Sequence, residues 1–160
     1  MAIATMAQTA DLSPTIVEVL YGEALELADE VRAAFDLSGR LTAACDDEDL
    51  ARIALSCEAL RTTTRMMHAI AWLLNQRAYL SGELSEFQLQ RHGRLPTERA
   101  GPPNEHLDLL APAFRELIER TRRFYERIER LDLAWRARFE TQPSVVGSLR
   151  ERLGQAVVGV

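Results

Sequence analysis

The sequence predicts an all-α protein, an antiparallel three-helix bundle with long helices and flexible tails, and three observations carry this prediction. Apolar residues recur in alternating steps of three and four over three long segments, at about 14–36, 47–81 and 111–139, which is the spacing of one helical face. Glycine and proline gather between these segments, where they end helices. A length of 160 residues, of which 47% are hydrophobic, suits one domain with an ample core.

The first predicted helix begins at Ser13 and Pro14, because serine caps a helix and proline fits its first position. It ends near Asp36, where Ser38 and Gly39 supply a stop signal. Its outer face carries six acidic residues against one arginine. Such a face is either an ordinary solvated surface or an electrostatic docking surface, and both interpretations stay open.

The central predicted helix carries the strongest periodic signal. Counted in heptads, its apolar seam falls on Leu50, Ile53, Cys57, Leu60, Thr64, Met67, Ala71, Leu74 and Ala78. Only Thr64 interrupts the apolar series, so we expect this seam to pack in the interior, with Cys57 as a small buried thiol. Four acids at 46–49 precede the helix. We interpret them as N-terminal caps, since a calcium loop needs ligands at alternate positions and a glycine.

The central helix also has more apolar surface than one seam requires. From residue 66 to residue 74 only one side chain is polar, and the apolar ones outside the seam include Met66, Ile70, Trp72 and Leu73. A helix that is apolar on nearly all sides must be covered on nearly all sides. These four side chains either widen the core of one chain or also form a homodimer interface. We favour the second interpretation, because most soluble oligomers are symmetric dimers.

The remaining chain divides into a connection, a third helix and two tails around a bundle that spans 13–140. Glycine and proline between 93 and 104 forbid a continuous helix and predict a long loop, preceded by a few helical turns. The third helix, 111–139, carries more arginines than acids, so it complements the acidic first helix. Residues 1–12 are expected to be disordered, and residues 141–160 to form a flexible C-terminal tail.

No catalytic, cofactor-binding or metal-binding residues are predicted. All 19 basic residues are arginine, which excludes lysine chemistry such as Schiff-base formation. None of the three histidines stands at metal-ligand spacing from another ligand, and Cys57 and His68 lie too far apart on one helix to act as a pair. Two cysteines, no export signal and no membrane-spanning stretch lead us to expect a soluble cytoplasmic protein.

Two polar strips are the candidate protein-binding surfaces. One lies on the central helix and the other on the third, and their members are Glu58, Arg61, Thr62 and Arg65, then Arg122, Tyr125 and Glu129. Arginine and tyrosine often anchor interfaces, although most such strips are ordinary solvated faces. Nucleic acid is a disfavoured partner, because the net charge is -5 and the arginines are interleaved with acids on long helices.

Three segments together resemble a known bacterial family. They are LYGEALELADEVRAAFD at 20–36, SCEALRTTTRMMHAIAWLLNQRAYLSGEL at 56–84 and LIERTRRFYERIERLD at 117–132. These segments are similar to the regulators of CtrA degradation, RcdA, a family also classed as one of uncharacterised function, DUF1465. The central segment is the most specific of the three.

The resemblance implies a dimeric three-helix bundle that is not an enzyme and has a flexible C-terminal tail. It implies an adaptor in cell-cycle proteolysis that acts with a response regulator and a ClpX-type unfoldase to bring substrates to the ClpXP protease. Two alternatives stay open. One is a DNA-associated regulator whose arginine-bearing third helix contacts phosphate, and the other is an enzyme with an inter-subunit pocket lined by His68 or Cys57.

Overall fold

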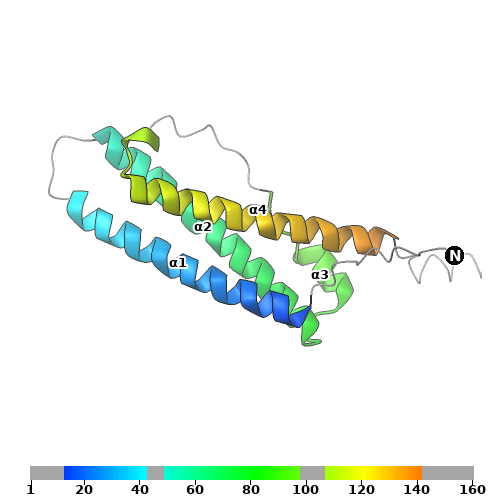
Figure 1. Ribbon diagram of the computed structural model, residues 1–160. Coiled ribbons are helices and arrows are strands. Elements are labelled where there is room, and N and C mark those ends of the chain that lie inside the picture. Colours follow the sequence, from blue (N-terminus) through cyan, green and yellow to red (C-terminus); the bar gives the residue numbers. More distant parts are fainter. Residues whose placement is uncertain (1–12, 43–48, 98–106, 142–160) are drawn as a thin grey trace, which may run out of the picture.

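The structure, a computed structural model, describes residues 13–42, 49–97 and 107–141. In these ranges the chain is helical and forms no strand, which confirms the predicted all-α class. In chain order the elements are α1 (Pro14–Thr42), α2 (Asp49–Leu80), α3 (Glu86–His92), the short 3-10 helix η1 (Leu107–Leu109) and α4 (Pro112–Thr141) (Figure 1). The predictions for the N-terminal segment, for acids 46–48, for the loop beyond residue 97 and for the C-terminal tail lie outside the described residues.

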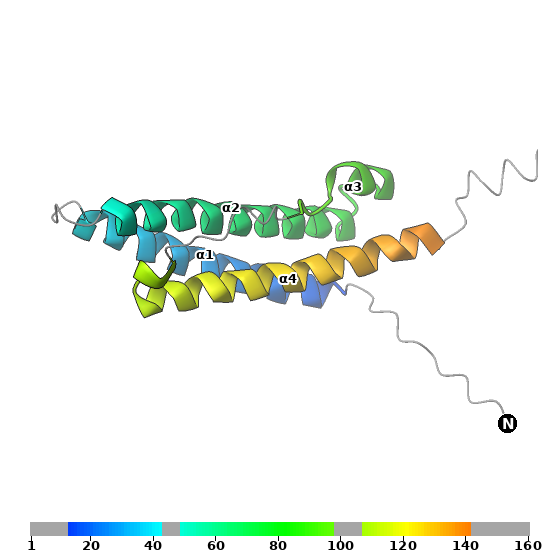
Figure 2. The ribbon, with the colours of Figure 1, turned by 90° about the horizontal axis from the view of Figure 1, so that it is seen from above.

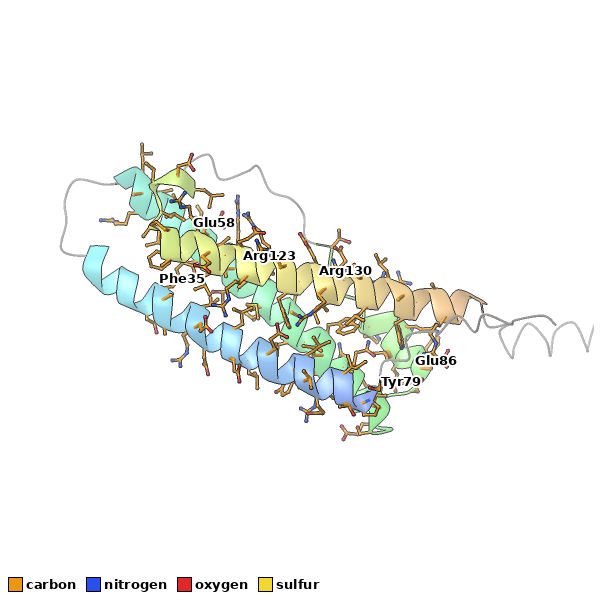
Figure 3. The ribbon with its side chains drawn as sticks, viewed as in Figure 1. Phe35, Glu58, Tyr79, Glu86, Arg123 and Arg130 are labelled. Carbon is orange, nitrogen blue, oxygen red and sulfur yellow. The ribbon has the colours of Figure 1, made fainter. Side chains whose placement is uncertain are left out.

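Helix α1 begins where the sequence predicts but ends later. The backbone amide of Ile16 and that of Val17 donate to the Ser13 carbonyl, at 3.0 and 3.2 Å. The helix then continues past Gly39 to Thr42, which corrects the predicted end. Glycine tolerates helical dihedral angles at a cost of only about 1 kcal/mol relative to alanine. Just before this extension, Phe35 stacks on Phe114 of α4, with ring centroids 5.7 Å apart (Figure 3).

The three long helices lie side by side, but they are not all antiparallel (Figures 1 and 2). Helix α1 runs opposite to α2, as predicted, but it also runs opposite to α4, since Arg120 pairs with Glu30 and Arg127, further along α4, pairs with the earlier Glu23. Helices α2 and α4 run in the same direction, since Arg65 contacts Thr121 and, further along both helices, Trp72 contacts Asp132. The prediction that consecutive long helices alternate in direction is therefore wrong for α2 and α4. The connection after α2 returns along the bundle, because α3 lies beside the end of α2 and η1 lies beside its start.

The main core lies between α1, α2 and α4. Its buried members are Val17, Leu20, Ala24, Leu27 and Val31 of α1, Met66, Ala69, Trp72 and Leu73 of α2, Leu95, and Leu117, Phe124, Tyr125 and Ile128 of α4. A smaller cluster of Ala54, Leu110 and Ile118 closes the end near η1. Near the opposite end, Tyr79 meets Trp135 edge to face, with ring centroids 6.1 Å apart (Figure 3). Buried side chains thus lie at both ends of the bundle as well as in its middle.

Helix α2 is rotated relative to its predicted packing. Its buried positions include the polar residues Glu58, Thr62 and Arg65, whereas the heptad seam faces outward. Cys57, predicted as a buried thiol, is exposed. The physical reason is that the two charged residues of the row keep partners inside the bundle. Arg65 donates to Thr121 of α4, and Glu58 pairs with Arg61 of α2 and lies near Arg122 of α4. With that row turned inward, the seam must face solvent.

Candidate protein-binding surface

Helix α2 turns a continuous apolar face outward. We call this face the α2 seam, and its members are Leu50, Ile53, Cys57, Leu60, Thr64, Met67, Ala71, Leu74 and Ala78. The exposed fraction is 59% for Leu50, 58% for Ile53, 70% for Leu60, 64% for Met67 and 43% for Leu74. Isolated exposed leucines are ordinary, but a contiguous apolar patch of several hundred Å² on a soluble protein marks a contact surface.

The α2 seam has the geometry of a surface for another helix. Its positions recur every 3.5 residues on average, the spacing at which two helices pack lengthwise through knobs and holes. The run from Leu50 to Ala78 is about 40 Å long at 1.5 Å per residue. Helices α1 and α4 both lie on the opposite side of α2 (Figure 2). Nothing in the described part of the chain therefore covers the middle of the seam.

The edges of the α2 seam present little free charge. Ser56, Thr63 and Asn75 are uncharged neighbours of seam positions. Two arginines flank the seam, and each is tied to an acid of its own chain. Arg61 Nη1 lies 3.2 Å from Glu58 Oε1, and Arg77 Nε lies 2.6 Å from a carboxylate oxygen of α1. A partner helix would meet an apolar stripe bordered by polar groups, as in a typical interface with a dry centre and a polar rim.

The predicted binding strip on α2 lies inside the bundle. Glu58 and Thr62 are fully buried, and Arg65 is 4% exposed. Arg65 Nη1 donates to Thr121 Oγ1 of α4 at 2.9 Å, and Glu58 Oε1 accepts a hydrogen bond from Arg61 Nη1. Figure 3 shows Glu58 between α2 and α4. The strip is thus an intramolecular interface with α4, which corrects the expectation that it faces other proteins.

The predicted strip on α4 meets the α2 strip from the other side. Tyr125 is buried, and its hydroxyl donates to the Pro96 carbonyl. Arg122 Nη2 lies 3.9 Å from the Glu58 carboxylate, and Glu129 is half-buried. The two predicted strips therefore contact each other inside the bundle instead of facing other proteins. Arg122 keeps 37% of its side chain exposed and marks the rim of this contact.

The four residues predicted at a dimer interface lie in or against the core. Met66, Trp72 and Leu73 are at most 2% exposed, and the half-buried Ile70 packs on the same cluster. Trp72 Nε1 donates to Asp132 Oδ1 of α4 at 2.9 Å. Their apolar surface is thus sheltered by their own chain, which corrects the expected location of the interface. Self-association itself stays a prediction, and the surface available for it is the α2 seam.

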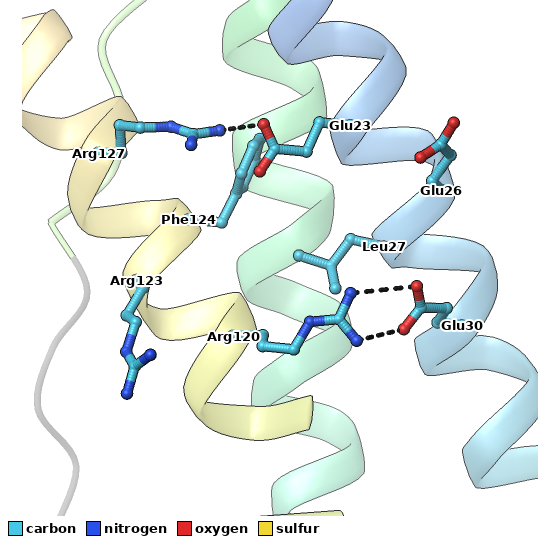
Figure 4. Close-up of a pocket in the computed structure, with 8 residues that line it drawn as sticks. All are labelled: Glu23, Glu26, Leu27, Glu30, Arg120, Arg123, Phe124 and Arg127. Atoms are coloured by element: carbon cyan, nitrogen blue, oxygen red, sulfur yellow. Dashed lines mark hydrogen bonds and ion pairs between the residues drawn. The ribbon is translucent and has the colours of Figure 1, made fainter. Parts of the chain in front are cut away.

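A groove between α1 and α4 is bridged by ion pairs (Figure 4). Arg120 donates from Nη1 and Nη2 to the two carboxylate oxygens of Glu30, at 2.6 and 3.1 Å. Arg127 pairs with Glu23. These contacts confirm that the basic third helix complements the acidic first one. The groove encloses about 220 Å³, less than the ~300–1,000 Å³ of most ligand sites. Four of its charged side chains, Glu23, Glu30, Arg120 and Arg127, pair across the two helices.

The ion pair of Glu30 and Arg120 shifts the titration of both groups. The hydrogen bond from Arg120 lowers the pKa of Glu30 below its ordinary value of 4.5, although burial opposes the shift. The same hydrogen bond raises the pKa of Arg120. Both side chains are nearly half exposed, so solvent screening limits the contribution of the pair to about 1 kcal/mol or less.

Other chemistry on the described surface is sparse. Within the described ranges, no three His, Cys, Asp or Glu side chains are grouped so that they could hold a metal ion. A hollow of about 140 Å³ near the start of α2 is lined by apolar side chains, among them Leu55, Leu110 and Phe114, and by Arg52. It brings no acid, base and nucleophile together. No helix in the described part is long and apolar enough to cross a membrane.

Fold and surface together define an all-helical protein that exposes a heptad-spaced apolar face. The chain belongs to a family described as "Protein of unknown function (DUF1465)", whose model matches residues 8–157. This match agrees with the DUF1465 part of the resemblance and does not name RcdA. No curated protein matches the chain. No solved structure matches it.

Proposed function

We propose that this protein is a non-enzymatic, protein-binding adaptor of the cytoplasm, and that it works as a homodimer joined through the α2 seam. The observation that supports this most is the seam itself. Five large apolar side chains stay exposed at heptad spacing, although the core on the other side of α2 is complete. An exposed stripe of this regularity is what a partner helix requires.

The size of the α2 seam suits a second copy. Its five large side chains expose about 500 Å² in total, and the smaller seam residues and flanks bring this toward the ~800 Å² per partner of a stable interface. Burial of about 1,000 Å² over both copies reaches the lower limit expected of a specific interface. A two-fold pairing of α2 with α2 lets each seam cover the other.

The adaptor role rests on the resemblance to RcdA proteins. In this proposal the dimer keeps other faces free for a response regulator and a ClpX-type unfoldase, and so brings substrates to the ClpXP protease. Helix α1 offers one such face, because Ile16 and Val19, three positions apart and so on one side of the helix, are both exposed. Holding two partners on one scaffold raises their effective concentration without any chemical step.

Light scattering of the full chain at micromolar concentration tests the self-association. Leu60 is 70% exposed, so Leu60→Glu should leave the monomer folded while placing an unpaired charge in the dimer interface. We expect a dimer for the wild type and a monomer of unchanged helical content for Leu60→Glu. Leu133→Glu is the matched control, since Leu133 is 58% exposed on α4 and should stay dimeric. A monomeric wild type contradicts self-association.

A pull-down of the full chain with a ClpX-type unfoldase and its response regulator tests the adaptor role. We expect both partners to be retained, and substrate degradation by the protease to become faster when the protein is added. Retention of neither partner by a dimeric wild type removes the adaptor role and leaves a helical dimer.

The DNA-associated alternative has less support. Arg120 and Arg127 of α4 pair with acids of α1, and Arg123 pairs with Glu119 on its own helix. A phosphate backbone would have to compete with these carboxylates. A gel shift distinguishes the two hypotheses, because binding to DNA that weakens steeply with added salt would favour the alternative.

A further inference from the structure

Helix α3 is fixed firmly to the end of α2. After α2 the chain turns through Gly82, whose φ of 81° lies in the left-handed region that glycine tolerates best. The amides of Glu83 and Leu84 both donate to the Ala78 carbonyl, at 2.8 and 3.1 Å. Ser85 then caps α3 in a reciprocal capping box. These contacts hold α3 in one orientation.

The rigid α3 nevertheless exposes an aromatic ring. Leu89 is fully buried and anchors α3, whereas Phe87 is 70% exposed. Two positions along a helix are separated by about 200°, so Phe87 points away from the side that Leu89 attaches. Figure 2 shows α3 protruding beyond α2 on the side that faces away from α1 and α4, which is the side of the α2 seam. A partner that covers the seam therefore meets α3 at the C-terminal end of α2.

This protrusion discriminates between the two orientations of a helix pair. In a parallel pair, the two α3 helices would meet at the same end and hold the seams apart. In an antiparallel pair they lie at opposite ends, each beyond the first turn of the other α2. The seam runs from Leu50 to Ala78, and its midpoint is Thr64, its polar position. A two-fold axis there brings two hydroxyls together, and each can donate to or accept from the other.

We propose that the two copies pack their α2 helices antiparallel about a two-fold axis at Thr64, and that Phe87 of each copy packs beside Leu50 and Ile53 of the other. This inference rests on the proposed self-association and adds its orientation and a second contact. Each Phe87 contributes about 140 Å² of exposed surface, which lifts the roughly 500 Å² of the seam toward the size of a stable interface. A single polar residue in an apolar seam is a known means of setting register.

Disulfide trapping tests the orientation. In an antiparallel pair centred on Thr64, position 57 of one copy opposes position 71 of the other, and the two Cys57 residues lie about 20 Å apart. In a Cys45→Ser background, where Cys57 is the remaining thiol, mild oxidation should therefore give no covalent dimer. Adding Ala71→Cys should give covalent dimers joined through positions 57 and 71, as mapped by mass spectrometry. Linkage of Cys57 to Cys57 overturns the antiparallel pairing while keeping self-association, and a monomer by light scattering overturns both.

Substitution of Phe87 tests the second contact. Phe87→Ala should weaken dimerisation by at least about tenfold in dissociation constant, because each dimer loses two aromatic contacts. The melting temperature of the monomer, measured in the Leu60→Glu background, should stay the same, since the ring is exposed within one chain. Leu133→Ala serves as the control and should leave dimerisation unchanged. A dissociation constant unaffected by Phe87→Ala overturns the contact.

Discussion

The rotation of α2 can be tested by comparing two leucines of the same helix. Leu73 is fully buried in the main core, whereas Leu60 on the seam is 70% exposed. Leu73→Ala removes three buried carbon atoms and leaves a cavity among α1, α2 and α4. Such a change costs about 2–5 kcal/mol in free energy of unfolding. For a chain of this size, a loss of 3 kcal/mol lowers the melting temperature by roughly 6–12 °C.

Urea unfolding followed by circular dichroism measures this difference. The experiment is done in the Leu60→Glu background, so that dissociation of a dimer does not contribute to the apparent stability. In that background, Leu73→Ala should lower the free energy of unfolding by about 2–5 kcal/mol. Met67→Ala, at a seam position with 64% exposure, should change it by about 0.5 kcal/mol or less. If Met67→Ala cost more than Leu73→Ala, the seam would face the core, as the heptad pattern alone suggests, and our description of α2 would be wrong.

Two further predictions concern polar groups of the bundle. Thr62 Oγ1 is buried without a hydrogen-bond partner, so Thr62→Val should leave the free energy of unfolding unchanged or raise it by up to about 1 kcal/mol in urea titrations; a clear loss would mean that the hydroxyl is satisfied. The pKa of Glu30 is lowered by Arg120, so its contribution is present above the unfolded-state pKa near 4.5 and is lost as the pH falls through the lower folded-state pKa. Glu30→Gln should therefore flatten the stability profile below about pH 4.5 by roughly 0.2–1 kcal/mol, whereas Glu26→Gln on the same helix should not remove this step.

Much of the fold follows from local patterns, while the orientation of α2 does not. The start of α1 at Ser13 and the charge complementarity of α1 and α4 depend on short-range capping and on net charge, and both are visible in the sequence. The heptad count also found the apolar stripe of α2, but placed it in the interior, whereas it is exposed. Sequence rules send apolar residues inward because unpaired buried polar groups are costly. The rule fails where a second helix supplies the partners, as Thr121 does for Arg65.

The predicted binding strip on α2 and the predicted dimer interface were wrong for the same reason. Glu58, Thr62 and Arg65 look like a solvated strip when α2 is considered alone, and Trp72 looks like surplus apolar surface. The signal that both belong inside lies on α4, in Thr121 and Asp132, more than fifty positions away. The parallel direction of α2 and α4 was equally out of reach, since a long connection permits either direction.

The parallel placement of α4 also has a consequence for how the chain folds. Helices α1 and α2 are adjacent in the sequence and can pair early, but α4 can dock only after the intervening connection has crossed the length of the bundle. The contact between Trp72 and Asp132 spans 60 positions, and contacts of such separation slow folding. The indole of Trp72 gains its acceptor only when α4 docks, so in a Trp135→Phe variant, where Trp72 is the remaining tryptophan, its fluorescence should report that docking.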